Sequence, residues 1–120
     1  MITGIQQIHV QVEDINRAID FYQNTLGMPL MMSFPEQNMA FFDCAGTRLY
    51  LGKNPEYESK AFIYYQTSNI DKAYLQLIDK QVSIIKEPMI IHKADDSESW
   101  LCAFKDSEGN TLHLVQDKRI

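Results

Sequence analysis

The chain has 120 residues, 45% hydrophobic and 22% charged, a composition that supports one folded core and excludes a disordered chain. Its net charge of −5 and its scattered basic residues argue against a nucleic-acid partner. No apolar run approaches the roughly 20 residues of a membrane span, and the N-terminus does not resemble a secretory signal. We therefore expect no membrane partner and a cytoplasmic protein, with Cys44 and Cys102 as free thiols.

The first elements in chain order are a strand and a capped helix. Apolar and polar residues alternate over residues 8–13, which predicts a half-buried strand. Asp14 is placed to cap a helix that runs to about Leu26 with one apolar stripe. Gly27 can adopt the left-handed conformation that ends a helix.

Three strands are expected to complete this first part, at residues 29–34, 38–43 and 48–52. Met31, Met32 and Phe34 in the first of them are expected to serve core or dimer packing rather than a ligand site. The polar stretch 53–60 contains a proline and predicts a linker.

The second part repeats this order after the linker. Residues 61–66 predict a strand, 69–80 a helix, and 82–85 and 89–92 two short strands broken by Pro88. The acidic stretch 94–99 predicts a solvated hairpin tip, and His92 beside it a surface residue. Two final strands are expected at residues 100–105 and 110–116.

Two internal matches show that the chain contains a repeat. Residues 12–18 align with 67–73, and residues 39–51 align with 102–114. These alignments place His9 opposite Tyr64, Tyr50 opposite His113, and Phe41 opposite Phe104. They predict an α+β fold of two tandem βαβββ modules, about residues 1–54 and 61–120, each a mixed four-stranded sheet with one helix on its outer face.

Strand alternation predicts a second feature, a polar and aromatic sheet face turned away from the helices. That face should carry Gln7, His9, Gln11, Arg48, Tyr50, Phe62, Tyr64, Gln66, Thr111 and His113. Such a composition is unusual for a core and indicates a concave ligand site. Arg48 could bind an anionic group through its guanidinium.

At these residues the chain resembles the vicinal oxygen chelate superfamily, which includes glyoxalase I, extradiol dioxygenases, fosfomycin-resistance thiol transferases and bleomycin-resistance proteins. The resemblance covers residues 5–116 and is most specific in VEDINRAIDFYQNTLGM and FKDSEGNTLHLVQ. It implies one domain whose two sheets form an open cup with the helices outside, and often a homodimer. It also implies a divalent metal, such as Zn, Ni, Mn or Fe, at positions that correspond to His9, Tyr50, Tyr64 and His113.

Three functions remain open from the sequence. The first is metal-assisted catalysis of the lyase, isomerase or dioxygenase type, with His9 and His113 as metal ligands. True glyoxalase activity is disfavoured because histidine and tyrosine replace the glutamate ligands of that family. The second is metal-free chemistry with His9 or His113 as a general base. The third is non-catalytic binding of a small molecule, as in bleomycin-resistance proteins. In each case the predicted ligand-binding residues are Gln11, Arg48, Tyr50, Tyr64, Gln66 and Trp100.

Overall fold

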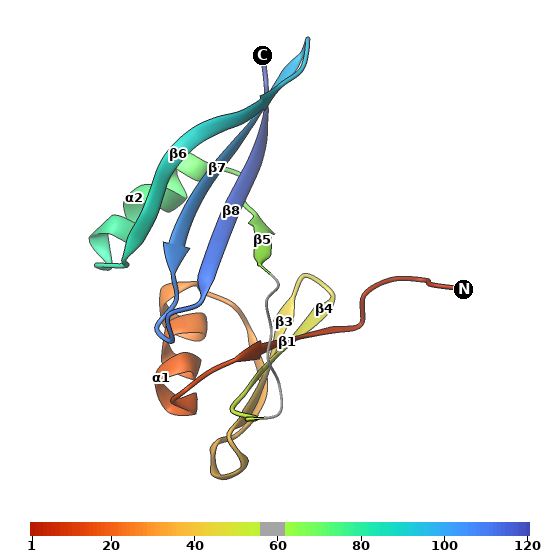
Figure 1. The fold of residues 1–120 in the computed structure, drawn as a ribbon, viewed down its shortest axis with the longest axis vertical. Helices are drawn as coiled ribbons and strands as arrows, with labels where there is room; N and C mark the ends of the chain where they lie inside the picture. The colour runs from red at the N-terminus through yellow and green to blue at the C-terminus, as the bar shows by residue number, and fades with distance from the viewer. Residues whose placement is uncertain (56–61) are drawn as a thin grey trace. The chain divides into compact units, whose positions relative to one another are not determined.

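The computed structural model describes residues 1–55 and 62–120, which fall into two compact units, residues 1–60 and 61–120 (Figure 1). We call these units module 1 and module 2 and describe each by itself. Residues 56–60 of the predicted linker and Ala61 of the predicted fifth strand lie outside the described residues.

Each module contains one mixed four-stranded sheet, as the repeat predicted. Module 1 has β1 (Gln7–Gln11), β2 (Leu30–Phe34), β3 (Met39–Cys44) and β4 (Thr47–Gly52) in the order β1-β4-β3-β2. Module 2 has β5 (Ile63–Gln66), β6 (Ile84–Lys93), β7 (Ser97–Lys105) and β8 (Thr111–Arg119) in the equivalent order β5-β8-β7-β6. The first strand of each module pairs in parallel with the last, and the other pairs are antiparallel. The predicted fold class and strand order are confirmed.

The two helices begin at equivalent side-chain caps. Helix α1 (Ile15–Asp20) begins where the Asp14 carboxylate accepts a hydrogen bond from Arg17 N at 3.1 Å. Helix α2 (Ile70–Asp79) begins where the Asn69 side chain accepts one from Lys72 N at 3.0 Å. Both contacts satisfy a backbone N–H that the first turn leaves without a helical partner.

The end of the first helix differs from a regular α-helix. After Asp20 the chain continues as a π-helical segment, Phe21–Thr25, in which Leu26 N donates to Phe21 O. Gly27 follows at φ +71°, the left-handed conformation that the sequence predicted. The apolar spacing predicted the length of this helix but not its wider last turn.

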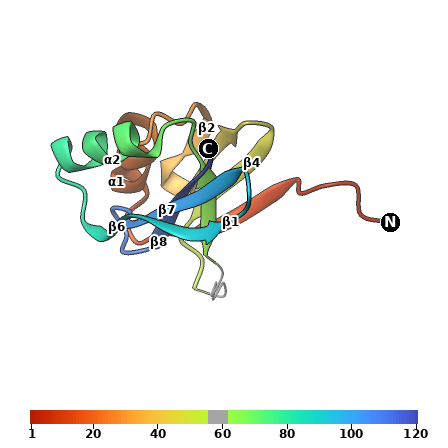
Figure 2. The same ribbon diagram turned by 90° about the horizontal axis from the view of Figure 1, so that it is seen from above.

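Each helix packs on its own sheet and buries that side of the strands. Helix α1 contacts β3 and β4, and α2 contacts β6, β7 and β8. Figure 2 shows α2 beside the strands of its own sheet. The fully buried side chains on this side include Tyr22, Phe42 and Leu51 in module 1 and Ile70, Phe104 and Leu112 in module 2. We call the opposite side of each sheet its far face.

The strand register corrects one part of the predicted repeat. Tyr50 pairs with Phe41 across β3 and β4, whereas His113 pairs with Ala103 across β7 and β8. Phe104 therefore corresponds to the buried Phe42, and Phe41 has no aromatic equivalent in module 2. The alignment slipped by one residue because it assumed equal turns, and the turn after β7 is longer than the turn after β3.

Pro88 does not break the chain into two short strands, so that prediction was wrong. Residues 84–93 form the single strand β6, whose pairing with β7 shifts register between Lys86 and Met89. Strand β6 is at the edge of its sheet, so its outer side has no neighbouring strand. A proline or a bulge on that side therefore removes no hydrogen bond between strands.

Core packing, one of the two alternatives predicted for Met31, Met32 and Phe34, is wrong, whereas dimer packing stays a prediction. Met31, Met32 and Phe34 are 42–50% exposed on another edge strand. Cys44 and Cys102 are free thiols, as predicted. Among the described residues, no helix combines the length and the apolar character needed to cross a membrane.

Candidate functional site

A row of four aromatic rings crosses the far face of module 1, one ring from each strand. The Tyr50 ring is stacked on Phe41 at a centroid distance of 4.9 Å, and His9 meets Tyr50 edge-on at 4.7 Å. Phe34 extends the row beyond Phe41 at 6.5 Å. The register explains the row, because His9 pairs with Tyr50 and Tyr50 pairs with Phe41, so all three point to one face.

The imidazole of His9 is held at the parallel β1–β4 pair. Its Nε2 atom is buried, and a Cβ atom added at Gly52 would lie 3.0 Å from it and 2.7 Å from Cε1 of Tyr50. Burial lowers the pKa of His9 below its ordinary value, because the charged form loses hydration there. His9 is therefore a neutral imidazole at physiological pH.

The polar side chains of this face are partly committed to structure. Arg48 donates from Nε to Gln7 Oε1 at 2.7 Å, and its Cζ lies 5.7 Å from the centroid of the Phe41 ring. Gln11 accepts a hydrogen bond from Asn54 N at 3.1 Å, which ties the chain after β4 back to β1. Arg48 therefore places a positive charge beside the aromatic row, whereas the side chain of Gln11 stabilises the connection between β1 and the chain after β4.

Module 2 presents a smaller cluster at the equivalent position. Tyr64 is stacked on His113 at 4.2 Å, and Phe62 meets the same imidazole edge-on at 5.8 Å. His113 Nδ1 lies 3.3 Å from Ile63 O. Because a carbonyl oxygen can only accept, this hydrogen bond places a proton on Nδ1, so in the neutral imidazole the lone pair is on Nε2. Gln66 shares this face through its pairing with Val115 and is exposed.

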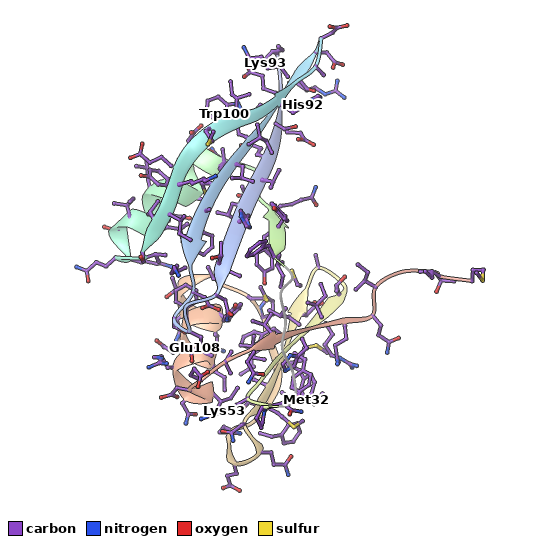
Figure 3. The ribbon with its side chains drawn as sticks, in the orientation of Figure 1. Met32, Lys53, His92, Lys93, Trp100 and Glu108 are labelled. Carbon is purple, nitrogen blue, oxygen red and sulfur yellow. The ribbon has the colours of Figure 1, made fainter. Side chains whose placement is uncertain are left out.

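Trp100 does not belong to the His113 cluster, which corrects the predicted ligand set. It pairs with Gln116, whose side chain accepts from Ile70 N at 2.8 Å, so Trp100 lies on the helix side of the sheet. Lys118 lies 4.4 Å above its ring, and its indole N–H donates to Glu98. Figure 3 shows Trp100 on β7. His92 and Lys93 lie near the tip of the β6–β7 hairpin, and Glu108 lies at the other end of the sheet. His92 is exposed, as predicted.

Neither module by itself provides a set of donors that fits the divalent metal implied by the resemblance. Residues 1–55 and 62–120 contain no group of three or more histidine, cysteine, aspartate or glutamate side chains that could hold a metal ion. Each far face offers one histidine with a tyrosine, and a phenol must lose a proton of pKa about 10 before it ligates well. The buried Nε2 of His9 lies 3.0 Å from the position that a Cβ atom on Gly52 would occupy. A catalytic zinc site normally needs three protein ligands.

Sequence reasoning missed several members of the far face of module 1. Phe34 was expected to serve core or dimer packing, Phe41 was aligned with Phe104 without a place on this face, and Gly52 was predicted only as the end of a strand. The hairpin contains the signal for Phe41, because a two-residue turn at residues 45 and 46 pairs Phe41 with Tyr50. Only the three-dimensional neighbours of Gly52 could identify its role.

Comparison with proteins of known sequence and structure supports the fold over nearly its whole length. YraH of Bacillus subtilis, described as an uncharacterized protein, is 24% identical over 92% of this chain and 95% of its own length. A superfamily member from Sphaerobacter thermophilus is 27% identical with a TM-score of 0.78, covering 95% of this chain and 97% of that one.

Lactoylglutathione lyase from Agrobacterium tumefaciens has the same fold at 16% identity, with a TM-score of 0.76 and coverage of 94% and 92% of the two chains. A model of the Glyoxalase/Bleomycin resistance protein/Dioxygenase superfamily matches residues 4–114. The βαβββ repeat and this match agree, and the chain belongs to the Glyoxalase/Bleomycin resistance protein/Dioxygenase superfamily.

Proposed function

We propose that this protein binds a small organic anion with a planar or apolar body, and that it does so without a resident metal. The observation that carries the proposal is the aromatic row of His9, Tyr50, Phe41 and Phe34 with Arg48 over it. Ligand sites are typically apolar and aromatic surfaces with a few placed polar groups. The second far face, with Tyr64 and His113, provides the same type of surface.

The charge preference comes from Arg48. Its partner Gln7 is neutral, and Arg48 forms no ion pair within the described part of the chain, so the hydrogen bond fixes the guanidinium without neutralising it. Ring edges are the electropositive part of an aromatic group, and the edges of this row add to the attraction for an anion. A guanidinium can bind a carboxylate or phosphate with two parallel hydrogen bonds.

The proposal places this chain among binding proteins rather than metalloenzymes. Superfamily members commonly bind divalent metals, but the donors described here do not form such a site. Bleomycin resistance proteins appear in the name of the family, and sequestration or sensing of a small molecule needs no metal. Binding without turnover is the behaviour that we propose.

The test is a titration of the full chain, treated with EDTA, with 2-naphthoate, 2-naphthylmethanol and 2-naphthylmethylamine. These probes share a planar body and differ in charge. We expect the order anion, neutral, cation in affinity, and we expect Tyr50→Ala to weaken all three. Arg48→Gln should weaken naphthoate alone, by about tenfold, the equivalent of roughly 1.4 kcal/mol. Arg17→Gln, at an exposed position of α1, is the matched control.

Three outcomes of this titration would each reject a different part of the proposal. Absence of binding by all three probes at millimolar concentration would reject the ligand surface. Equal affinity for the anion and the neutral probe would reject the role of Arg48. Binding that appears only after a divalent metal is restored would reject the metal-free function.

A second candidate function is acid–base chemistry at His113, and one observation favours it. The hydrogen bond from Nδ1 to Ile63 O fixes the tautomer, so that Nε2 can accept a proton from a bound molecule. The test is hydrogen–deuterium exchange of the acidic C–H of 3-(2-naphthyl)pyruvate, followed by NMR with and without the protein. Exchange that is accelerated by the protein and lost in His113→Gln would establish this function, and unchanged exchange would leave binding alone.

A further inference from the structure

Gly52 lies where the two key side chains of module 1 converge. A Cβ atom added at this residue would be 2.7 Å from Cε1 of Tyr50 and 3.0 Å from Cζ of the same ring. It would also be 3.0 Å from Nε2 of His9. Contacts below 3.0 Å force a neighbouring group to move.

The strand pattern explains why these atoms meet at a glycine. Tyr50 is two residues before Gly52 on β4, so both belong to the far face, and the tyrosine ring extends along the strand over Gly52. His9 is on β1, which pairs in parallel with β4, and Gly52 pairs there with Gln11. A side chain at residue 52 would occupy the space that the phenol and the imidazole share.

The glycine is not required by its backbone conformation. Four other glycines, at residues 4, 27, 46 and 109, have positive φ, whereas Gly52 does not. Any residue could adopt the backbone of Gly52, so the constraint there is the space above it.

We propose that Gly52 is a positioning residue, whose missing side chain allows Tyr50 and His9 to form one continuous binding surface. The inference rests on the proposed function only for its ligand readout. The arrangement of His9 can be followed without any ligand, so failure of the inference and failure of the proposed function are distinguishable.

The experiment compares Gly52→Ala with the parent chain by NMR titration of the His9 ring. The added methyl should displace the imidazole from its buried place, and the pKa of His9 should rise toward its ordinary value of about 6.5. The dissociation constant for 2-naphthoate should increase by about tenfold. An unchanged His9 titration would overturn the inference, whatever the ligand does.

Gly46→Ala is the matched control. Gly46 has φ +98° in the β3–β4 turn, and an added Cβ would meet nothing within 4 Å. That variant should lose stability through backbone strain but leave the His9 titration unchanged. A His9 shift of equal size in Gly46→Ala would show that the probe reports general destabilisation, and would overturn the assignment.

A second variant covers the case in which Gly52→Ala does not fold. Tyr50→Ala removes the two contacts of the phenol ring, including the one at 2.7 Å. The double variant Tyr50→Ala/Gly52→Ala should therefore fold, with a melting temperature close to that of Tyr50→Ala. Loss of folding in both backgrounds would mean that the clash with Tyr50 is not the cause, and the inference would fail.

Discussion

Two adjacent phenylalanines in β3 provide the sharpest test of how module 1 is built. Phe42 is 0% exposed and packs against Tyr22 at a centroid distance of 6.0 Å, whereas Phe41 is half-buried on the far face. We predict that Phe42→Ala is much more destabilising than Phe41→Ala, although the two substitutions remove the same atoms.

The magnitudes follow from burial. Truncation of a fully buried phenylalanine costs about 3–5 kcal/mol, because it removes apolar contacts and leaves a cavity. Phe41→Ala loses partial burial and one stacked partner, together about 1–2 kcal/mol. Domains of this type have a total stability of about 5–15 kcal/mol, so Phe42→Ala should leave the fold marginal.

Urea unfolding followed by far-UV circular dichroism measures the difference. With a slope of about 1–3 kcal/mol/M, the central values place the unfolding midpoint of Phe42→Ala about 1 M below that of Phe41→Ala. Ligand affinity should show the reverse order among the folded variants, since Phe41 belongs to the aromatic row. Equal midpoints, or a lower midpoint for Phe41→Ala, would refute the assignment of the two faces.

Three further predictions concern the caps, the pH response and the β7–β8 turn. Asp14→Ala and Asn69→Ala should each reduce the free energy of unfolding by about 1 kcal/mol, measured by urea unfolding, and a neutral effect would contradict the caps. Burial lowers the pKa of folded His9, so below about pH 6.5 the unfolded chain binds a proton that the folded chain does not. Stability should therefore fall as pH drops from about 6.5 through the folded pKa of His9, and this part of the loss should be absent in His9→Gln. Asp106 is 6% exposed and accepts hydrogen bonds from Glu108 N, Asn110 N and Asn110 Nδ2, so Asp106→Ala should cost about 2–4 kcal/mol by the same unfolding measurement. Asp95→Ala, at the exposed hairpin tip, should stay within about 0.5 kcal/mol, and a similar loss there would contradict this account.

The sequence predicted the histidine and tyrosine positions because local alternation determines them. Tyr50 lies between the buried Leu49 and Leu51, and His9 precedes the buried Val10, so their faces could be assigned before their contacts were known. The cap residues Asp14 and Asn69 were predictable for the same reason, since a cap depends on the first helical turn alone.

The remaining site features depend on contacts between segments that are distant in sequence. The face of Trp100 could not be assigned from alternation, because it depends on the register with β8, which the length of the intervening turn sets. Arg48 and Gln11 each have a partner about 40 residues away, and alternation could not identify Gln7 or Asn54 as those partners. The prediction that Pro88 ends a strand was wrong because a proline that would interrupt an interior strand is tolerated in an edge strand such as β6.

The most direct test of the central claim is calorimetric titration of the full chain with 2-naphthoate, first after EDTA treatment and then after equilibration with zinc. The account predicts measurable binding in EDTA, unchanged by zinc and weakened by Arg48→Gln and Tyr50→Ala. Binding that requires zinc, and that is lost in His9→Ala and His113→Ala, would contradict the account and identify a metal site.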